Sequence, residues 1–594
     1  MTGLYFVAIG LLLAAAIFVQ ARWPASATSM PQDPAAAWGQ RRSDQILWIG
    51  FILVALTCFA IQIYLTRQTF IDDAYIVFRY SQNLLDGHGL RWNAQDAPTE
   101  GYTDLLYVLL VAPFMAIGVD PLFAARGLNA LALGGIVYLL YRILRRDFVL
   151  ARVPAIAIAT GFIVATRSAE ILTGGLETIV FTFFFFWAFE RTLEFYREPT
   201  RNTAISIGAL SFAAFLVRPE GVFVPIAILG AFVLLDHWRI ANERKGVTIL
   251  LAAFGLPLIV YLAWKQLYFG SIVPNPALVK AGQHFLTSER GLGSIANFFG
   301  DHAVLLAAAA ASLLPLRSRP VGRPELTAIL LVVGYLLFYA RVDTLADWAE
   351  RYFYPTSVLL YFLALPVFVF ALRTLATWPA LAPVRIAIGF FLMSALFFRI
   401  HNGIEGYGSL LKAGVVSGPE DRNLVLGHKL AKIKGIRDMS IASVDAGAVP
   451  FATMSYHIDM VGLNTRYIAE HPDVTSAAAY LFDQRPTIIL YRTLQSGEYV
   501  TTGHGPLGDE RTWAANPGWD EYAYAGTFDE SDVYCMNFFV RRDAPQFDQL
   551  MQALRTTVAD RVAAAPPVKL GREAAQVPAT QFPPETTHTA PVRN

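Results

Sequence analysis

The sequence predicts a polytopic α-helical membrane protein that ends in a soluble α/β domain. Hydrophobic residues make up 55% of the 594-residue chain and charged residues only 16%. Soluble proteins average about 25% charged residues, so the deficit indicates that much of the surface faces lipid. After about residue 400 the composition changes: charged and turn residues return, and no apolar run is long enough to span a bilayer.

Apolar runs of roughly the 20 residues needed to cross a bilayer recur before residue 400, and they predict about 11–12 transmembrane helices. The runs cover residues 2–20, 46–66, 123–142, 150–168, 175–195, 203–218, 221–236, 247–267, 303–316, 325–341, 354–373 and 383–400. The first run could instead be a signal peptide. No Lys or Arg precedes it, however, which favours an uncleaved helix.

Basic residues gather in alternate loops, and this sets the predicted orientation. Cytoplasmic loops carry an excess of Lys and Arg, and five loops fit that rule together. They contain Arg41 and Arg42; Arg142, Arg145 and Arg146; Arg197 and Arg201; Arg239, Arg244 and Lys245; and Arg317, Arg319 and Arg323. The other loops and the C-terminal domain are then predicted on the outer side.

The predicted organisation has four parts. They are an N-terminal helix and cytoplasmic linker (1–45), a transmembrane domain (46–400) with a first outer loop at 67–122, a soluble α/β domain (401–562) and a tail rich in Ala, Pro, Thr and Gln (563–594). The tail composition predicts disorder. In the α/β domain, strands are predicted at 440–444, 487–491 and 537–540, and a helix at 423–433. A short apolar run at 105–117 predicts a helix in the membrane interface.

The predicted outer loops carry ionisable residues, whereas the inner loops carry mainly basic ones. Asp72 and Asp73 stand side by side directly after a predicted span, and because adjacent carboxylates repel, a nearby cation or metal is expected. Ionisable groups near membrane depth by default mark functional sites. The other ionisable residues in these loops are Glu100, Glu177, Arg218, Glu220, Lys280, Glu350 and Arg351, and the polar Asn275 lies among them.

Each cluster also has a simpler structural interpretation. The Asp72–Asp73 pair could cap a helix, Arg218 and Glu220 could form a structural ion pair, and Lys280 could reach lipid headgroups. The cysteines, Cys58 and Cys535, and the scattered histidines lack metal-ligand spacing. A net charge of +1 gives no field that would attract nucleic acid.

A series of motifs, in order, resembles the GT-C superfamily of integral-membrane glycosyltransferases. The block IDDAYIVFRYSQNLLDGHGLRWN with the later EGYTDLLY resembles its first outer loop. Within the superfamily, the likeness is to the bacterial group that includes the terminal β-(1→2) arabinofuranosyltransferase of mycobacterial cell walls. It continues through residues 173–178 (TGGLET), 218–221 (RPEG), 268–280 (YFGSIVPNPALVK), 350–355 (ERYFYP), 445–451 (DAGAVPF) and 458–464 (IDMVGLN).

The resemblance implies an inverting glycosyltransferase that moves a sugar, such as arabinofuranose, from a polyprenyl-phosphate donor to a cell-envelope glycan acceptor. It implies a multi-pass protein of the bacterial cytoplasmic (inner) membrane, with the active site and the C-terminal domain facing the periplasm. The expected partners are the donor, the glycan and the bilayer, with no nucleic acid. Paired Asp residues are also compatible with a divalent cation, Mg²⁺, Mn²⁺ or Ca²⁺.

The resemblance also suggests roles for the residues. Asp72 matches the general base, while Asp73 would orient the acceptor or help to bind a cation. Lys280 and Arg351 are the candidates for the donor phosphate, with Arg79 behind them, since Arg suits phosphate. Glu100, Glu177, Arg218, Glu220 and Asn275 are the candidate substrate-binding residues.

Two other functions fit part of the pattern. A non-catalytic glycan-binding protein would keep the fold without the chemistry. A transporter or flippase for lipid-linked sugars would show charges at the midplane and paired interrupted helices in two similar halves. The polar residues instead concentrate on one side, as expected for an enzyme that works at one membrane face.

Overall fold

The computed structural model describes most of the chain. The described residues are 42–67, 70–235, 241–281, 288–313, 322–342, 344, 348–377, 422–471, 473–496, 510–530, 534–563, 566 and 569–575. The helices predicted at 2–20 and 383–400, and most of the predicted tail, lie outside them.

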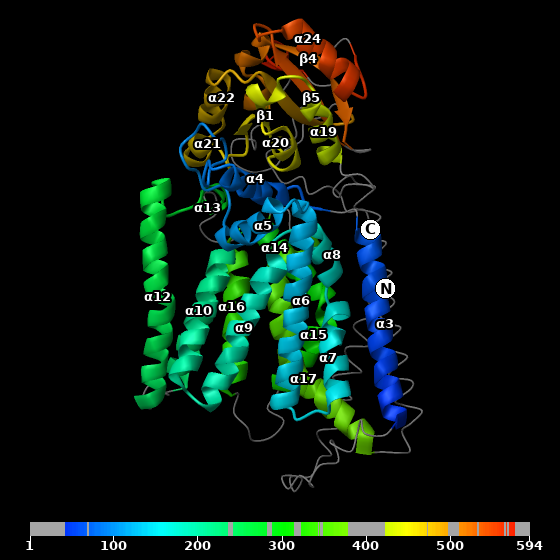
Figure 1. Ribbon diagram of the computed structural model, residues 1–594, viewed down its shortest axis with the longest axis vertical. Coiled ribbons are helices and arrows are strands. Elements are labelled where there is room, and N and C mark those ends of the chain that lie inside the picture. The colour runs from blue at the N-terminus through cyan, green and yellow to red at the C-terminus, as the bar shows by residue number, and fades with distance from the viewer. Residues whose placement is uncertain are drawn as a thin grey trace.

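The first part of the chain forms a helical bundle. The C-terminal part forms a sheet domain that lies at one end of this bundle (Figure 1). Ten of the predicted spans fall within the described residues, and each corresponds to one helix of the bundle. These helices are α3 (Arg42–Thr66), α6 (Pro121–Arg146), α7 (Arg152–Ala165), α9 (Thr178–Arg197), α10 (Arg201–Val217), α11 (Phe223–Leu234), α12 (Ala241–Phe269), α15 (Ala303–Leu313), α16 (Arg323–Tyr339) and α17 (Tyr354–Thr377). Two further helices, α8 (Ser168–Gly174) and α14 (Glu289–Asp301), were not predicted.

Four segments of the described chain are long and apolar enough to cross a membrane: Trp48–Thr66, Pro121–Arg146, Glu243–Phe269 and Ala349–Phe370. Two helix pairs, α7 with α8 and α14 with α15, are bent by 63° and 79°, and counting each pair as one span gives up to six. This count is lower than the 11–12 expected from the sequence, partly because α10 and α11 are short. The fold is nevertheless that of a multi-pass membrane protein.

The loops that join α6 to α7 and α9 to α10 lie at the end of the bundle away from the sheet domain (Figure 1). Their basic residues form ion pairs there. Arg146 Nη1 lies 2.7 Å from Glu190 Oε1, and Arg197 pairs with Asp147. Two of the loops predicted to share one side therefore do share one end of the molecule.

The first loop lies between the bundle and the sheet domain. Its helices α4 (Ala74–Leu85) and α5 (Leu105–Ala116) are found at this end of the bundle (Figure 1). The helix predicted at 105–117 is thereby confirmed. Leu109 and Ile117 are exposed on and after α5, as expected of a helix that meets lipid headgroups.

The C-terminal domain contains a five-stranded sheet of order β2-β1-β3-β5-β4. Its strands are β1 (Ser440–Ser443), β2 (Tyr456–Asp459), β3 (Ile488–Leu494), β4 (Tyr522–Asp529) and β5 (Tyr534–Arg541). β1 is parallel to β2 and β3, while β5 is antiparallel to β3 and β4. Ile488 and Leu490 pack into one core and Ile489 and Tyr491 into another, because successive side chains of a strand point to opposite faces.

The strands predicted at 440–444, 487–491 and 537–540 coincide with β1, β3 and β5, and the helix predicted at 423–433 coincides with α19 (Arg422–Ala431). β2 and β4 were not predicted from the sequence. β2 has only four residues, and β4 contains Ala523, Ala525 and Gly526, with a register shift between Tyr524 and Gly526. Ala and Gly are depleted in strands, so such a segment gives a weak signal.

Candidate active site

The first loop is attached to the sheet domain through Arg79 on α4. Its guanidinium is buried and donates to the carbonyl oxygens of Trp92 (3.0 Å), Pro450 (2.6 Å) and Ser455 (2.7 Å), and to Asn93 Oδ1 (3.1 Å). Burial lowers the pKa of Arg79 to about 9, so the side chain is still charged at neutral pH. Every guanidinium nitrogen is thus used for docking, which is a different task from the phosphate contact considered from the sequence.

Aromatic packing reinforces this attachment. Phe451 of the DAGAVPF motif lies on α4, with its ring centroid 5.3 Å from Tyr75 and 6.3 Å from Phe78. Nearby, Asn464 of the IDMVGLN motif accepts from the Tyr80 hydroxyl at 3.3 Å. The motifs at 445–451 and 458–464 therefore form the face of the sheet domain that meets the first loop.

Asp72 also belongs to this junction. Its Oδ2 accepts from the backbone N–H of Gly447 at 2.8 Å, and its Oδ1 from that of Ala448 at 2.9 Å. These N–H groups begin α20 (Ala448–Thr453). A Cβ at Gly447 would lie 2.0 Å from the Asp72 carbonyl oxygen, so the approach requires glycine. Asp72 thus caps a helix, but one that lies about 375 residues further along the chain.

Asp73, the next residue, has different surroundings. It occupies the N-cap position of α4, yet its side chain makes no capping hydrogen bond, and 42% of that side chain is exposed. Its Oδ2 lies 3.4 Å from Arg351 Nη2. Arg351 is thus one cation beside the paired carboxylates.

Arg351 reaches this position from the turn η3 (Trp348–Phe353). Ala349 and Glu350 there adopt left-handed backbone angles, with φ of 54° and 56°. The Arg351 side chain is 7% exposed and donates to the Tyr352 hydroxyl at 3.1 Å. Its Nε is buried and has no hydrogen-bond partner within the described part of the chain. Arg351 thus keeps hydrogen-bonding capacity for a ligand.

Arg218, Glu177 and Glu220 come together as one cluster. Arg218 Nη1 lies 2.6 Å from Glu177 Oε1, and Arg218 Nη2 lies 2.9 Å from Glu220 Oε1. The Tyr339 hydroxyl accepts from Arg218 at 2.8 Å and donates to Glu220. The cluster is close to Arg351, because the Tyr352 ring centroid lies 5.4 Å from the guanidinium of Arg218 and 4.9 Å from that of Arg351.

Asp104 joins this cluster from the first loop, although it was not predicted from the sequence. The residue is buried, and burial together with the negative charge of Glu177 raises its pKa well above the ordinary value, although Arg218 opposes the shift. Asp104 is therefore protonated more readily than an ordinary aspartate. It lies within EGYTDLLY, so its position in that motif was a usable signal.

Glu100 forms a second buried ion pair with Lys265 of α12. The Lys265 Nζ to Glu100 Oε2 distance is 2.6 Å, and the two side chains are 6% and 5% exposed. Burial raises the pKa of Glu100 to about 7, against the effect of Lys265. Lys265 was missed, yet a lysine inside a predicted span is a functional signal.

Asn275 begins α13 (Asn275–Ala281), and its N–H donates to the Glu100 carbonyl at 3.1 Å. Its Nδ2 is buried without a hydrogen-bond partner among the described residues. Lys280 is part of the same helix, but its side chain is not among the described ones. Glu100 and Asn275 are therefore placed together, and the predicted phosphate contact of Lys280 stays a prediction.

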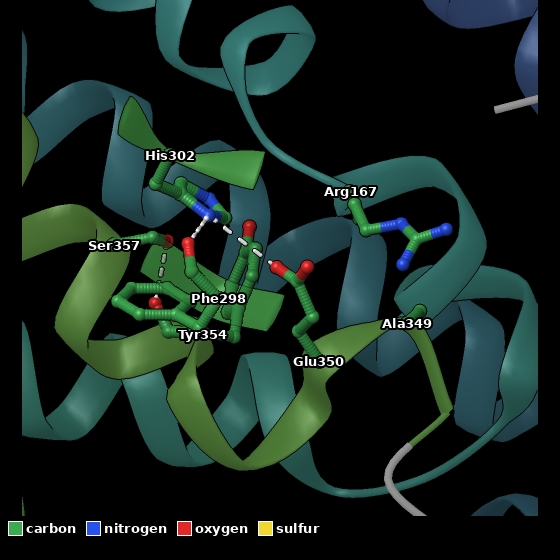
Figure 2. A pocket seen from close by; sticks show the side chains of 7 residues that line it. All are labelled: Arg167, Phe298, His302, Ala349, Glu350, Tyr354 and Ser357. Carbon is green, nitrogen blue, oxygen red and sulfur yellow. Dashed lines mark hydrogen bonds and ion pairs between the residues drawn. The ribbon is translucent and has the colours of Figure 1, made fainter. Parts of the chain in front are cut away.

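A small cavity of about 10 Å³ lies beside the turn that carries Arg351. Figure 2 shows His302 and Glu350 facing each other across it, with His302 Nδ1 3.3 Å from Glu350 Oε2. The full lining is Arg167, Phe298, His302, Ala349, Glu350, Tyr354 and Ser357. Arg167 and His302 stand at the breaks of the two bent helix pairs. Both breaks thus pack around the turn that presents Arg351.

The described residues contain no group of three or more His, Cys, Asp or Glu side chains placed to hold a metal ion. Within that part of the chain, the positive charges at the site come from Arg351, Arg218 and Lys265.

A family model described as a domain of unknown function (DUF8728) matches residues 428–546, which include the whole sheet. The chain is 28% identical over 261 residues to the terminal β-(1→2)-arabinofuranosyltransferase of Mycobacterium tuberculosis, an alignment that covers 40% of this chain and 39% of that protein. It is 27% identical over 357 residues to the enzyme of the same name from Corynebacterium glutamicum, covering 53% and 50%. The chain thus spans half or less of the length of these relatives.

Among solved structures, the fold resembles ArnT from Cupriavidus metallidurans. The TM-score is 0.52 for the apo structure and 0.50 for the structure bound to undecaprenyl phosphate, each at 12% identity. The matches cover 82% and 76% of this chain and 97% and 93% of the ArnT chain. At this identity the likeness shows the fold alone. The chain thus shares the fold of ArnT, in keeping with the likeness of its motifs to the GT-C superfamily, and by its sequence it is similar to the terminal β-(1→2)-arabinofuranosyltransferases.

Proposed function

We propose that this chain is an inverting glycosyltransferase that moves a sugar from a polyprenyl-phosphate donor to a cell-envelope glycan on the periplasmic side of the cytoplasmic membrane. Arabinofuranose is the first sugar to test, because the sequence relatives are arabinofuranosyltransferases. The GT-C fold supports a lipid-linked donor, since one ArnT structure holds undecaprenyl phosphate.

The observation that carries this proposal is the Asp73–Arg351 pair at the junction of the bundle and the sheet domain. Inverting transfer needs a base for the attacking hydroxyl, positive charge for the leaving phosphate, and both substrates held in line. The Asp72–Asp73 pair supplies carboxylates. Arg351 supplies a buried guanidinium whose Nε has no partner within the described residues, and arginine binds phosphate with two hydrogen bonds at once.

The neighbouring polar residues are proposed to bind the sugar and the acceptor. Glu177 and Glu220 accept from Arg218, so their carboxylates are oriented before a substrate arrives. Asn275 offers a buried side-chain nitrogen, Nδ2, without a hydrogen-bond partner in the described chain. Preorganised groups of this kind can accept or donate hydrogen bonds to sugar hydroxyls without first rearranging.

Binding of a divalent cation, Mg²⁺, Mn²⁺ or Ca²⁺, at the paired aspartates remains a prediction. A carboxylate pair alone gives such an ion too few ligands, so waters or substrate phosphate oxygens would have to complete its coordination. Titration of transfer against EDTA and added cations tests this directly.

The first experiment is transfer of radiolabelled sugar from a panel of polyprenyl-phosphate donors to cell-wall glycan, with the purified wild type and Arg351→Gln compared. We expect transfer from one donor, and a loss of about 10²–10³-fold in kcat for the variant, as when one charge-stabilising donor is removed elsewhere. Arg437→Gln is the matched control, because Arg437 is exposed on the sheet domain and its loss should leave the rate unchanged.

The proposal is contradicted if the wild-type protein is folded but turns over no donor in the panel. Binding of glycan without turnover would then favour the non-catalytic glycan-binding protein. Movement of the intact lipid-linked sugar across vesicles would favour the transporter.

A further inference from the structure

We infer that the two adjacent aspartates have separate roles, with Asp73 as the base that takes the proton of the acceptor hydroxyl and Asp72 as a positioning residue that holds the first loop on the sheet domain. This assignment rests on the proposed function. It reverses the roles expected from the resemblance, in which Asp72 is the base.

The contacts of Asp72 connect the first loop to the sheet domain. Each carboxylate oxygen accepts one backbone N–H, from Gly447 or Ala448, at 2.8 and 2.9 Å. The Asp72 carbonyl also accepts from Tyr75 N at 3.0 Å, at the start of α4. Both oxygens are thus oriented towards α20.

Asp73 has the properties that a base requires. Its side chain is 42% exposed, so a hydroxyl can reach it. It does not cap its own helix. Within the described part of the chain, its one ion-pair partner is Arg351, at 3.4 Å. Inverting displacement puts the base and the phosphate-binding group on opposite sides of the anomeric carbon, so the substrates would have to enter between Asp73 and Arg351 and separate this pair.

The acceptor hydroxyl oxygen bonds to the anomeric carbon while its proton passes to the Asp73 carboxylate. The bond from that carbon to the phosphate oxygen breaks, and its electron pair leaves with the polyprenyl phosphate, whose charge Arg351 offsets. Asp72 touches neither substrate. It fixes the start of α4, and so the position of Asp73 relative to Arg351.

Azide can distinguish the two roles, because it attacks carbon without losing a proton and so needs no base. Asp73→Ala and Asp72→Asn are compared with the wild type, with the glycan hydroxyl and with sodium azide as acceptors, by release of polyprenyl phosphate. We expect Asp73→Ala to lose on the order of 10²–10⁴-fold with the hydroxyl and to retain most of its azide reaction. Asp72→Asn should lose both reactions in the same proportion, by up to about 10²-fold.

The opposite pattern overturns the inference: Asp72→Asn that keeps azide transfer while losing hydroxyl transfer makes Asp72 the base. Asp73→Ala with an unchanged hydroxyl rate also overturns it. If the wild type does not use azide, the pH dependence of hydroxyl transfer decides. The rise of the rate with pH should then persist in Asp72→Asn and vanish in Asp73→Asn. Absence of wild-type transfer to the glycan would instead reject the proposed function.

A second variant tests the positioning role without changing either aspartate. Gly447→Ala places a methyl group 2.3 Å from Asp72 Oδ2, which must displace the carboxylate from α20. We expect the same loss as for Asp72→Asn, and no further loss in the double variant, because both changes break one contact. If the fold-losses in transfer rate of the two single variants multiply in the double variant, Asp72 has a role beyond this contact.

Discussion

At the scale of single residues, the buried pair of Glu100 and Lys265 makes stability depend on pH. Burial raises the pKa of Glu100 from its ordinary 4.5 to about 7. Between these values the folded chain keeps a proton that the unfolded chain has released, so rising pH favours unfolding. The free energy of unfolding attributable to Glu100 should fall by on the order of 3 kcal/mol as the pH rises through this window.

The measurement is the thermal unfolding midpoint in detergent between pH 4.5 and 8, for the wild type and Glu100→Gln. The wild-type midpoint should fall more steeply, because the variant cannot titrate at this position. Asp104 titrates in the same direction, so the difference between the two slopes is the informative quantity. Glu198→Gln is the control, since Glu198 is exposed at the other end of the bundle. Identical slopes for Glu100→Gln and the wild type would contradict the assignment.

At the scale of elements, the turn after β2 is held by one side chain. Asp459 is fully buried, and its carboxylate accepts from the N–H groups of Val461 (2.9 Å), Gly462 (3.2 Å) and Asn464 (2.8 Å). This turn presents Asn464 to the first loop, where a Cβ at Gly101 would lie 1.9 Å from Asn464 Oδ1. The conformation of one turn therefore sets the fit between two parts of the chain.

Replacing this carboxylate should loosen the turn. Asp459→Asn retains one oxygen acceptor, but its amide NH₂ then faces backbone N–H donors that it cannot accept. Loss of a hydrogen bond to a buried charged group lowers the free energy of unfolding by about 1.5–3 kcal/mol. We expect a lower unfolding midpoint and faster hydrogen exchange over residues 458–464. Asp483→Asn, at an exposed position of α22 (Val474–Asp483), should change neither. Unchanged exchange in Asp459→Asn would show that the turn is held by other contacts.

Elements that depend on local pattern could be predicted, and contacts between distant segments could not. The apolar runs located the bundle helices, and short strand-like runs located β1, β3 and β5. Asp72 shows the limit. Its sequence neighbours suggested a cap for the next helix, and nothing local indicates that its partners are Gly447 and Ala448. Arg79 is similar, since its partners Pro450 and Ser455 are equally remote.

At the scale of the whole molecule, the bundle has two chemically different ends. One end meets the first loop and the sheet domain and holds the carboxylates with Arg351 (Figure 1). The other holds loops whose arginines pair with Glu190 and Asp147. An enzyme that works at one membrane face needs this asymmetry, because donor, acceptor and base must meet on the same side.

This asymmetry predicts the orientation of the chain in the cell. Basic loops stay in the cytoplasm, so the sheet domain should face the periplasm. Asp483→Cys places a thiol at an exposed position of the sheet domain, and Asn202→Cys places one near the start of α10, at the opposite end of the bundle. A membrane-impermeant maleimide should label the first variant in intact spheroplasts and the second only after lysis. Labelling in the reverse order would place the sheet domain, and with it Asp73 and Arg351, in the cytoplasm and away from a periplasmic glycan.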